Sequence, residues 1–404
     1  LGKYVAGEVS PRLVAGAPPA PDSRRVAFVF SGQGPQWFAM GRELVQREPV
    51  FRDAVQAIDA LLSPLSGWSL LEILADEPDK SRLSETVFAQ PALFAVHVAL
   101  ADLWKSWGIE PDGVVGHSIG ELAALYVGGA LSLEEAVRLV WLRASIMQRA
   151  TGNGAMAAVS LSESQAEDIV AEIGDALSIG AINSTNGVVL SGTPQAVGAA
   201  LEKVDQRGIS NRRLPVQYAF HSRQMDPLAS ALVEAMGSVA SAAPRLPFYS
   251  TVTGALERAA PAAEYFGRNV RQPVRFSSAI GEMLDDGFGI FLEIGPHPVL
   301  AVSISECAAD RGREPVLLAS LRREREERET MLRACAGLYA AHHQPRLQAL
   351  NRAAPAAMRL PGYPWQRNRY WLRERPSIRE ELSAPESECL GHRVPAATVR
   401  VFEC

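Results

Sequence analysis

Residues 113–126 constrain the fold of this chain more strongly than any other stretch. Residues 113–115 are apolar and predict a buried strand, whereas 121–126 have a helix-like pattern. Between them, residues 116–120 read Gly-His-Ser-Ile-Gly, which fits GxSxG. In a strand–turn–helix context this pattern is typical of a nucleophile elbow, because the glycines permit the strained turn that exposes the serine hydroxyl. The helix N-terminus adds N–H groups that stabilise negative charge there. We therefore predict that Ser118 is a nucleophile.

Strands and helices alternate along much of the chain. Short β-branched and aromatic runs predict strands at 25–30 and 113–115, and apolar periodicity predicts helices around 41–62 and 91–107. A further strand is expected at 289–294. Such alternation is typical of a parallel sheet with helices on both faces. The expected fold class is therefore α/β.

The stretch from about 155 to 215 has a different order. Its predicted elements are a strand at 155–159, a helix at 162–173, strands at 177–182 and 188–190 around an Asn-Gly turn signal, a helix at 194–207 and a strand at 211–216. The order βαββαβ is typical of a ferredoxin-like unit. We expect a large α/β-hydrolase-like domain, 24–153 and 215–320, into which a small ferredoxin-like subdomain, 154–214, is inserted.

Both ends of the chain are expected to be connecting segments. Residues 1–23 contain four prolines and no apolar periodicity, which predicts a linker. Residues 322–329 mix both signs of charge at helical spacing, which favours a solvated helix face over a charged binding site. Residues 360–371 are rich in proline and aromatic residues and are expected to pack as an extended strap. The chain becomes polar from 377 and starts something new near 390.

Composition excludes several classes of protein. A length of 404 residues suggests roughly two or three compact units. The 40 Lys+Arg and 45 Asp+Glu leave a net charge of −5, which argues against nucleic acid or an anionic membrane as the main partner. The four separated cysteines favour neither disulfides nor a metal site, so a reducing cytoplasm is expected. We find no run of about 18 apolar residues and no signal peptide, so no membrane span is expected. Leu1 in place of Met suggests a piece of a longer or processed chain.

A serine nucleophile needs a base, and the chain contains seven histidines. His221 ends the strand-like stretch 213–220 and is the expected base. His297 lies between two prolines, where a structural turn is favoured over catalysis. His97 is expected in the core or at the surface, and His117, inside the elbow, is expected to point away from the reacting oxygen. No acidic third member stands out, so either the acid is hidden or a backbone carbonyl orients the imidazole.

Arg143 lies on the otherwise apolar face of a helix predicted at 134–150. A buried unpaired charge costs free energy, so its guanidinium must find a partner. One alternative is a structural carboxylate of the protein. The other is a bidentate clamp for a carboxylate of the substrate, for which a planar guanidinium is suited.

The loop after the first strand reads Gly-Gln-Gly at 32–34. Trp37 stands where a dinucleotide-binding motif would have its third glycine, so this motif is not expected to bind a dinucleotide. Such a loop beside the elbow could instead lend a backbone N–H to an oxyanion hole.

Several motifs occur together in one order along the chain. They are Phe-Ser-Gly-Gln-Gly at 30–34, Gln-Pro-Ala at 90–92, the elbow at 116–120, Arg143, Tyr-Ala-Phe-His-Ser at 218–222, Asn269 with Pro-Val-Arg-Phe at 273–276, and Gly-Pro-His-Pro-Val at 295–299. This set, which covers about 24–320, resembles the acyltransferase domain of a type I polyketide synthase. That domain is related to malonyl-CoA:acyl carrier protein transacylase.

The flanking segments extend this resemblance. Residues 1–23 resemble the end of a ketosynthase-to-acyltransferase linker, and Tyr-Pro-Trp-Gln at 363–366 resembles part of a post-acyltransferase linker, 321–376. Residues 377–404 are expected to contain further linker and, from about 390, the opening of a dehydratase domain. Neighbouring ketosynthase and dehydratase domains of the same polypeptide are therefore implied partners.

The resemblance implies a ping-pong mechanism without a bound cofactor or metal. Ser118, activated by His221, would take the acyl group from acyl-CoA and pass it to the phosphopantetheine thiol of an acyl carrier protein. The backbone N–H groups of Gln33 and Ile119 would form the oxyanion hole. A backbone carbonyl orients the histidine in this family, and the matching position is Asn269. That would account for the missing acid.

The resemblance also implies the substrate contacts. Arg143 would pair with the carboxylate of the extender unit, and the remaining pocket candidates are Gln90, Tyr218, Phe220 and His117. Ile119 and Phe220 resemble malonyl-selective domains, in which a bulky ring fills the space of an α-methyl group. Tyr218 matches the methylmalonyl-type pattern. Malonyl-CoA is the expected substrate and methylmalonyl-CoA the alternative, since a methyl group changes binding by only about 1–3 kcal/mol.

Two other functions could use the same residues. A serine hydrolase of the thioesterase or lipase type would share the elbow, and an acid near His221 and a pocket without Arg143 would favour it. A catalytically silent docking module would carry a damaged serine or histidine, and here Ser118 and His221 are both intact.

Overall fold

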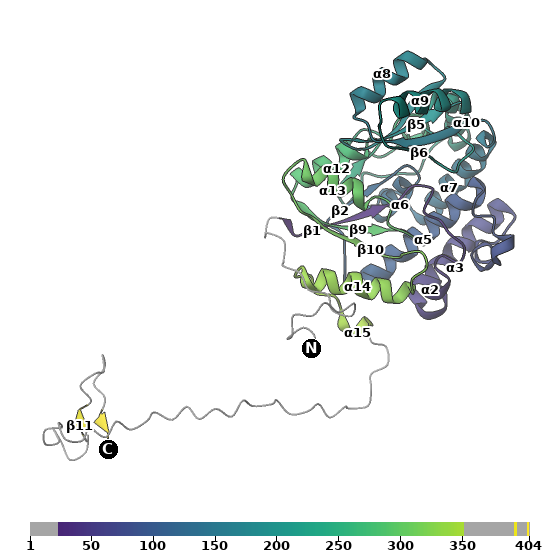
Figure 1. The fold of residues 1–404 in the computed structure, drawn as a ribbon. Coiled ribbons are helices and arrows are strands. Elements are labelled where there is room, and N and C mark those ends of the chain that lie inside the picture. The colour runs from purple at the N-terminus through teal and green to yellow at the C-terminus, as the bar shows by residue number, and fades with distance from the viewer. Residues whose placement is uncertain (1–22, 351–391, 394–401, 404) are drawn as a thin grey trace. The chain divides into compact units, whose positions relative to one another are not determined.

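The computed structural model describes residues 23–350, 392–393 and 402–403 (Figure 1). The chain divides into two compact units, Leu1–Arg352 and Ala353–Cys404. In the second unit, β11 (His392–Arg393) and β12 (Phe402–Glu403) form an antiparallel pair. The linker predicted over most of 1–23 and the strap predicted at 360–371 lie outside the described residues.

The first unit is built on a six-stranded sheet. Its strands are β1 (Arg25–Phe30), β2 (Gly113–Gly116), β7 (Phe248–Ser250), β8 (Ala255–Glu257), β9 (Phe288–Ile294) and β10 (Val316–Ala319), in the order β10-β9-β1-β2-β7-β8. All neighbouring pairs are parallel except β7 and β8. Residues 26–30 are completely buried, as expected for a parallel strand covered on both faces. The predictions of an α/β class and of strands at 25–30, 113–115 and 289–294 are confirmed.

Helices cover both faces of this sheet (Figure 1). Outside the inserted subdomain, the helices of this unit are α2 (Arg42–Arg47), α3 (Pro49–Ser66), α4 (Leu70–Ala75), α5 (Thr86–Ser106), α6 (Gly120–Val127), α7 (Leu133–Met147), α10 (Asp226–Met236), α11 (Ala263–Arg271), α12 (Phe276–Asp285), α13 (Ala301–Ala309), α14 (Glu327–Ala340) and α15 (Leu347–Leu350). The helix predicted at 41–62 is in fact two helices. Glu48 is extended between them (φ −116°, ψ 101°), because the residue before a proline disfavours helical angles.

Helix α5 is the central helix of the core. Its length and apolar composition alone would allow it to cross a membrane. Gln90, His97 and Asp102 interrupt its apolar sequence, so it is not an unbroken run of 18 apolar residues. In the fold, 89% of its most apolar stretch is buried inside the protein.

The small subdomain has its own sheet and core. Its elements are β3 (Ala155–Val159), α8 (Glu163–Ile173), β4 (Leu177–Ser184), β5 (Gly187–Gly192), α9 (Pro194–Gln206) and β6 (Asn211–Arg213). The sheet is antiparallel, in the order β4-β5-β3-β6, and buries a separate apolar cluster that includes Leu161, Ile169 and Leu190. The predicted βαββαβ order of a ferredoxin-like unit is confirmed.

Strand β4 also touches the large subdomain. The N–H of Ile182 donates to the carbonyl of Val274 at 2.8 Å, and the N–H of Val274 donates to the carbonyl of Gly180 at 3.0 Å. This short parallel bridge joins the small sheet to the segment between α11 and α12. The chain on either side of Val274 is therefore held in place by both subdomains.

The charged stretch 322–329 was predicted to be a solvated helix face, and the structure differs from this prediction at Glu327. Helix α14 begins only at Glu327, whose side chain is buried. The Glu327 carboxylate accepts hydrogen bonds from the N–H groups of Gly41, Glu43 and Leu44 at 2.6, 3.0 and 3.1 Å. These N–H groups open α2 and have no acceptor within their own helix, so a carboxylate is drawn to them. Helix α14 also contributes buried apolar side chains to the main core.

Candidate active site

Ser118 stands at the turn between β2 and α6, as the GxSxG pattern predicted. Its backbone has φ +54°, in the left-handed region that non-glycine residues rarely adopt. A side chain on Gly116 would collide with the backbone of Gly120 and Glu121, and one on Gly120 would collide with the Phe30 carbonyl. The two glycines are therefore required sterically, because the turn packs directly against β1.

Ser118 and His221 lie together although 103 residues separate them. The Ser118 Oγ is 2.8 Å from Nε2 of His221. Nδ1 of the same ring is 2.9 Å from the backbone carbonyl of Gln272. A carbonyl oxygen only accepts, so Nδ1 carries the proton and Nε2 presents a lone pair to the serine hydroxyl. The pair has the geometry of a nucleophile with its general base.

The sequence analysis expected the backbone carbonyl of Asn269 to orient His221, but the structure shows a different carbonyl in that place. It belongs to Gln272, three residues further along the chain. Asn269 lies inside α11, whereas Gln272 follows the helix in an extended conformation (φ −81°, ψ 157°) that releases its carbonyl from the helical ladder. Asn269 instead contributes its side-chain amide to the site.

Arg143 is buried on α7, with only 1% of its surface exposed. Its Nη2 donates to Ser118 Oγ at 3.1 Å and to Asn269 Oδ1 at 3.2 Å. Within residues 23–350, its Nε and Nη1 have no hydrogen-bond partner. No carboxylate in that range forms a direct ion pair with it, so the alternative of a structural carboxylate in contact with Arg143 is not found. Burial lowers the pKa of Arg143 to about 9, and the nearby Glu121 opposes that shift.

Burial also lowers the pKa of His221, the expected general base. The pKa of His221 is lowered to about 3, first by desolvation and then by the charges of Arg143 and His117. The imidazole is therefore neutral near pH 7, as a general base must be.

A second group of predicted residues is joined by hydrogen bonds to the Gln33 side chain. Gln90 Nε2 donates to Gln33 Oε1 at 3.1 Å, and Gln33 Nε2 donates to the hydroxyls of Tyr218 and Thr86, both at 3.2 Å. The Tyr218 and Phe220 rings are stacked, with centroids 3.7 Å apart and planes inclined by 13°. The structure thus brings Gln33, Gln90, Tyr218 and Phe220 together. Thr86 was not anticipated.

The predicted oxyanion donors lie on two adjoining turns. A Cβ on Gly32 would be only 2.9 Å from the His117 ring, so the Gln33 loop lies directly beside the elbow. In the described part of the chain, neither the Gln33 nor the Ile119 backbone N–H has a protein acceptor. Two such free N–H groups can stabilise an oxyanion.

His117 is held by the small subdomain. Its Nε2 is 2.9 Å from Oδ1 of Asn183 on β4, and its ring packs against Phe276. The structure thus links the elbow to the inserted sheet. It gives His117 no hydrogen bond to Ser118, and its role as a substrate contact stays a prediction.

The remaining two histidines of interest lie outside this network. His97 is buried and lies 3.2 Å from Ser31 Oγ. His297 Nδ1 accepts from the N–H of Arg323 at 3.1 Å, which agrees with a structural turn. That turn also receives the indole N–H of Trp37, which donates to Pro296 O at 3.0 Å.

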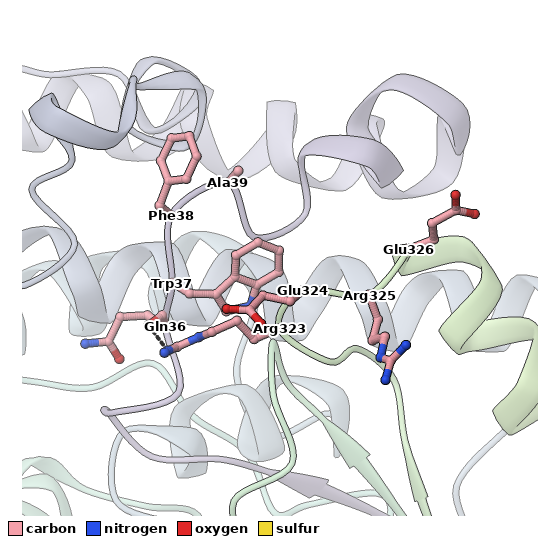
Figure 2. A pocket seen from close by; sticks show the side chains of 8 residues that line it. All are labelled: Gln36, Trp37, Phe38, Ala39, Arg323, Glu324, Arg325 and Glu326. Carbon is pink, nitrogen blue, oxygen red and sulfur yellow. Dashed lines mark hydrogen bonds between the residues drawn. The ribbon is translucent and has the colours of Figure 1, made fainter.

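A separate pocket of about 740 Å³ opens between residues 36–39 and 323–326. Figure 2 shows the Trp37 indole between the two loops, with the Arg323 guanidinium hydrogen-bonded to the main chain of Gln36 at 3.2 Å. The lining residues do not include Ser118, His221 or Arg143. The pocket is therefore distinct from the site around Ser118.

Besides Thr86 and Asn183, the sequence analysis missed Glu121 and Gln272, which contact the residues around Ser118. Glu121 is the only charged residue in the otherwise apolar helix α6, Gly-Glu-Leu-Ala-Ala-Leu-Tyr-Val. The reasoning that singled out Arg143, a charge on an apolar face, would also have found Glu121. Gln272 acts through its backbone, so no side-chain pattern could reveal it.

Comparison with known proteins agrees with this geometry. A family model described as the acyl transferase domain matches residues 27–345. Among curated proteins, an erythronolide synthase of Saccharopolyspora erythraea is 39% identical over 376 residues, which are 92% of this chain and 10% of that protein. Mycoketide-CoA synthase of Mycobacterium tuberculosis is 36% identical over 86% of this chain and 8% of its own length. The chain therefore spans about a tenth of these relatives.

Solved structures give the same result. The acyltransferase domain from the second module of the salinomycin polyketide synthase is 38% identical with a TM-score of 0.80, over 88% of this chain and 82% of that one. The domain from module 8 has a TM-score of 0.82 at 32% identity, over 86% and 82% of the two chains. The malonyl CoA-acyl carrier protein transacylase of Coxiella burnetii is 30% identical with a TM-score of 0.68, over 79% and 98%. The chain belongs to the acyl transferase domain family, as an acyltransferase domain of the kind found in polyketide synthases.

Proposed function

We propose that this domain transfers a malonyl unit from CoA to the phosphopantetheine thiol of an acyl carrier protein, with Ser118 as the covalent carrier. One observation carries the proposal. The same Ser118 Oγ lies 2.8 Å from His221 Nε2 and 3.1 Å from Arg143 Nη2. A nucleophile with its base and a receptor for a carboxylate thus meet at one oxygen, which suits an acyl group that carries a free carboxylate.

The first half-reaction follows from the dyad. His221 Nε2 takes the hydroxyl proton while Ser118 Oγ attacks the thioester carbonyl carbon. The carbonyl oxygen becomes negative and is held by the Gln33 and Ile119 N–H groups. Collapse of this intermediate breaks the carbon–sulfur bond, and the departing CoA thiolate receives the proton from His221. Ser118 is left as the malonyl ester.

The second half-reaction runs the same steps with another thiol. His221 accepts the proton of the phosphopantetheine thiol, whose sulfur attacks the ester carbonyl. The Ser118 oxygen leaves and recovers the proton from His221. The Gln272 carbonyl holds Nδ1–H throughout, so the ring keeps the tautomer that both steps need.

Arg143 would select acyl groups with a carboxylate. Its Nη2 is already engaged, and Nε and Nη1 are buried donors without a partner among the described residues. Unpaired buried donors cost free energy, and a hydrogen bond from Nη1 to a substrate carboxylate would recover part of that cost. A hydrolase acting on an uncharged acyl group has no use for such a guanidinium.

The Tyr218–Phe220 stack supports malonyl over methylmalonyl. The Phe220 ring is 5% exposed and lies against Tyr218, which is itself tied to Gln33. Two coupled rings cannot move aside independently, so they would occupy the space of an α-methyl group. Methylmalonyl remains the second candidate, because Tyr218 also matches the pattern of methylmalonyl-type domains.

The context of the domain is proposed on the same basis. We propose subdomains at 24–153 with 215–320 and at 154–214, and flanking linkers that lead to ketosynthase and dehydratase domains. Because α14 packs into the main core, the linker assigned to 321–376 would begin after this helix. Among the described residues, Cys307 and Cys335 are free and buried, which suits the reducing cytoplasm.

One competition experiment tests the function. The protein is mixed with equal malonyl-, methylmalonyl- and acetyl-CoA, and the acyl-enzyme is weighed by intact-protein mass spectrometry. Malonyl should dominate, and a Ser118→Ala variant should carry no adduct. A dominant acetyl adduct would contradict the role of Arg143, and an adduct on the variant would contradict the nucleophile. An acyl-enzyme lost to water faster than to carrier thiol would favour the hydrolase.

A further inference from the structure

Glu121 is a buried charge beside the active site that the mechanism above does not use. It is 1% exposed and lies one turn after Ser118 on α6. Its Oε1 accepts hydrogen bonds from the N–H and the hydroxyl of Thr251, at 2.5 and 2.9 Å. Its Oε2 accepts from the Tyr265 hydroxyl and from Asn269 Nδ2, both at 2.8 Å. Burial raises the pKa of Glu121, and the four hydrogen bonds from Thr251, Tyr265 and Asn269 oppose that shift by favouring the ionised form.

Asn269 connects this carboxylate to the nucleophile and to Arg143. Its Nδ2 donates to Glu121 Oε2 and, at 3.2 Å, to the backbone carbonyl of Ser118. Its Oδ1 accepts from Arg143 Nη2 at 3.2 Å. A carboxylate and a carbonyl only accept, so they determine which way the amide points. The orientation that Glu121 imposes is the one that presents an oxygen to Arg143.

We propose that Glu121 is the positioning residue for the extender carboxylate, and that it acts through the Asn269 amide to hold the Arg143 guanidinium. This inference rests on the proposed function. Because Nη2 is held by Asn269 and Ser118, the plane of the Arg143 guanidinium is set, and Nη1 is left to donate to a substrate carboxylate in one orientation. Pre-orientation of this kind reduces the entropy that binding must remove.

Charge adds to this positioning effect. Arg143 is buried, and no carboxylate among residues 23–350 touches it directly. Glu121 is the carboxylate whose charge raises the pKa of Arg143 against desolvation. It can therefore keep the guanidinium protonated in the empty site without occupying the nitrogens that the substrate needs. A carboxylate in direct contact with Arg143 would stabilise the cation equally, but it would occupy the N–H groups to which the substrate carboxylate binds.

A purely structural role for Glu121 is the main alternative, since its bonds to Thr251 and Tyr265 also brace α6 against neighbouring segments. The two roles differ in their effect on substrate choice. A structural brace would lower loading of every acyl group alike. A positioning residue for the carboxylate would lower malonyl loading and spare acetyl loading.

The test is the ratio of malonyl to acetyl loading in Glu121→Gln. Glutamine keeps the shape but places an NH2 group against one of the converging donors. Since a hydrogen bond to a charged group contributes about 1.5–3 kcal/mol, the ratio should fall roughly 10- to 100-fold. Each acyl-CoA is offered alone, and the initial rate of acyl-enzyme formation is measured by intact mass. An unchanged ratio in folded Glu121→Gln would overturn the proposal.

Glu327→Gln is the matched control. Glu327 is likewise buried and accepts several backbone N–H groups, yet it caps α2 outside the site. This variant should lose stability and keep the malonyl-to-acetyl ratio. A fall in its ratio equal to that of Glu121→Gln would mean that any buried glutamate has this effect, and the specific role would be refuted.

Asn269→Ala keeps the proposal testable if Glu121→Gln does not fold. This variant removes the amide that connects Glu121 to Arg143 and leaves three hydrogen-bond donors on Glu121. The malonyl-to-acetyl loading ratio should therefore fall as much as in Glu121→Gln. In the double variant, the two losses should not add, because both act through one path. Additive losses, or an unchanged ratio in Asn269→Ala, would contradict the link. Arg143→Ala separates this inference from the proposed function, because a normal ratio in that variant would remove the clamp itself.

Discussion

The Arg143 guanidinium donates a hydrogen bond to Ser118 Oγ across 3.1 Å, from a helix 25 residues further along the chain. The same oxygen faces His221 Nε2 at 2.8 Å. The atom that would form the acyl ester therefore lies next to the group that would bind the far end of the acyl unit. This closeness suits an acyl group whose carboxylate is separated from the reacting carbonyl by one carbon, as in malonyl.

Arg143→Ala should weaken malonyl loading far more than acetyl loading. Removing one partner of a buried charged pair costs about 2–5 kcal/mol, so malonyl loading should fall on the order of 100-fold. Acetyl has no carboxylate and should lose much less. Rates of acyl-enzyme formation with each acyl-CoA check this. Arg138→Ala on the same helix, which removes a partly exposed pair with Glu135, should leave both rates unchanged. Equal losses for malonyl and acetyl in Arg143→Ala would make the arginine structural.

Phe220→Ser should admit methylmalonyl. The change removes the ring that stacks on Tyr218, on the residue next to His221, and leaves the volume of that ring empty. The methylmalonyl-to-malonyl loading ratio should rise about 10-fold, the usual effect of one methyl group in an apolar pocket. Tyr218→Phe keeps both rings and should leave the ratio nearly unchanged. A constant ratio in Phe220→Ser would place the selectivity elsewhere.

The rate of Ser118 acylation should be level between pH 8 and about 5.5. Burial holds the pKa of His221 near 3, so the imidazole stays unprotonated and able to accept the serine proton over this range. The rate would fall only as the pH approaches that pKa. Single-turnover acylation with malonyl-CoA, with intrinsic fluorescence as a check of folding, measures this. A loss of half the rate near pH 6.5 would show an imidazole that titrates normally.

His97 should make the fold less stable as the pH falls. Burial lowers the pKa of His97 from 6.5 to about 3, so between these values the unfolded chain binds a proton that the folded chain does not. The contribution of His97 to the free energy of unfolding is therefore fully present above pH 6.5. It is lost as the pH falls below 6.5, by up to about 1.4 kcal/mol per pH unit. Urea unfolding of wild type and His97→Asn at pH 6.5 and 5.5 should show their difference in unfolding free energy shrink by about 1 kcal/mol.

The difference between wild type and His97→Asn also cancels the contributions of groups whose effect on stability has the opposite pH dependence. Burial raises the pKa values of Glu293 and Glu327 to about 7, so these groups stabilise the fold at low pH and lose that effect as the pH rises through 7. Both are present in wild type and variant and cancel in the difference. A difference that stays constant with pH would show that His97 is not kept neutral by the fold.

Features encoded within short stretches could be predicted from the sequence. The glycines around Ser118 predict its turn because a side chain at either position would meet backbone. The βαββαβ order predicts the small subdomain because each element carries its own periodicity and turn residues. Arg143 was found because a lone charge on an apolar helical face needs a partner, whichever partner that is.

Contacts between distant segments were decided only by the tertiary structure. The carbonyl that orients His221 comes from Gln272, 51 residues away, and the Glu121–Asn269 bond spans 148 residues. The Glu327 carboxylate accepts from Gly41, 286 residues earlier in the chain, at the start of α2. Glu327 is therefore buried, although its charged neighbours predicted a solvated side chain. Local periodicity describes which face of an element is apolar, but it does not record which element packs there. The sequence by itself therefore determined the fold class and the chemical character of the site, and packing determined which atoms meet in it.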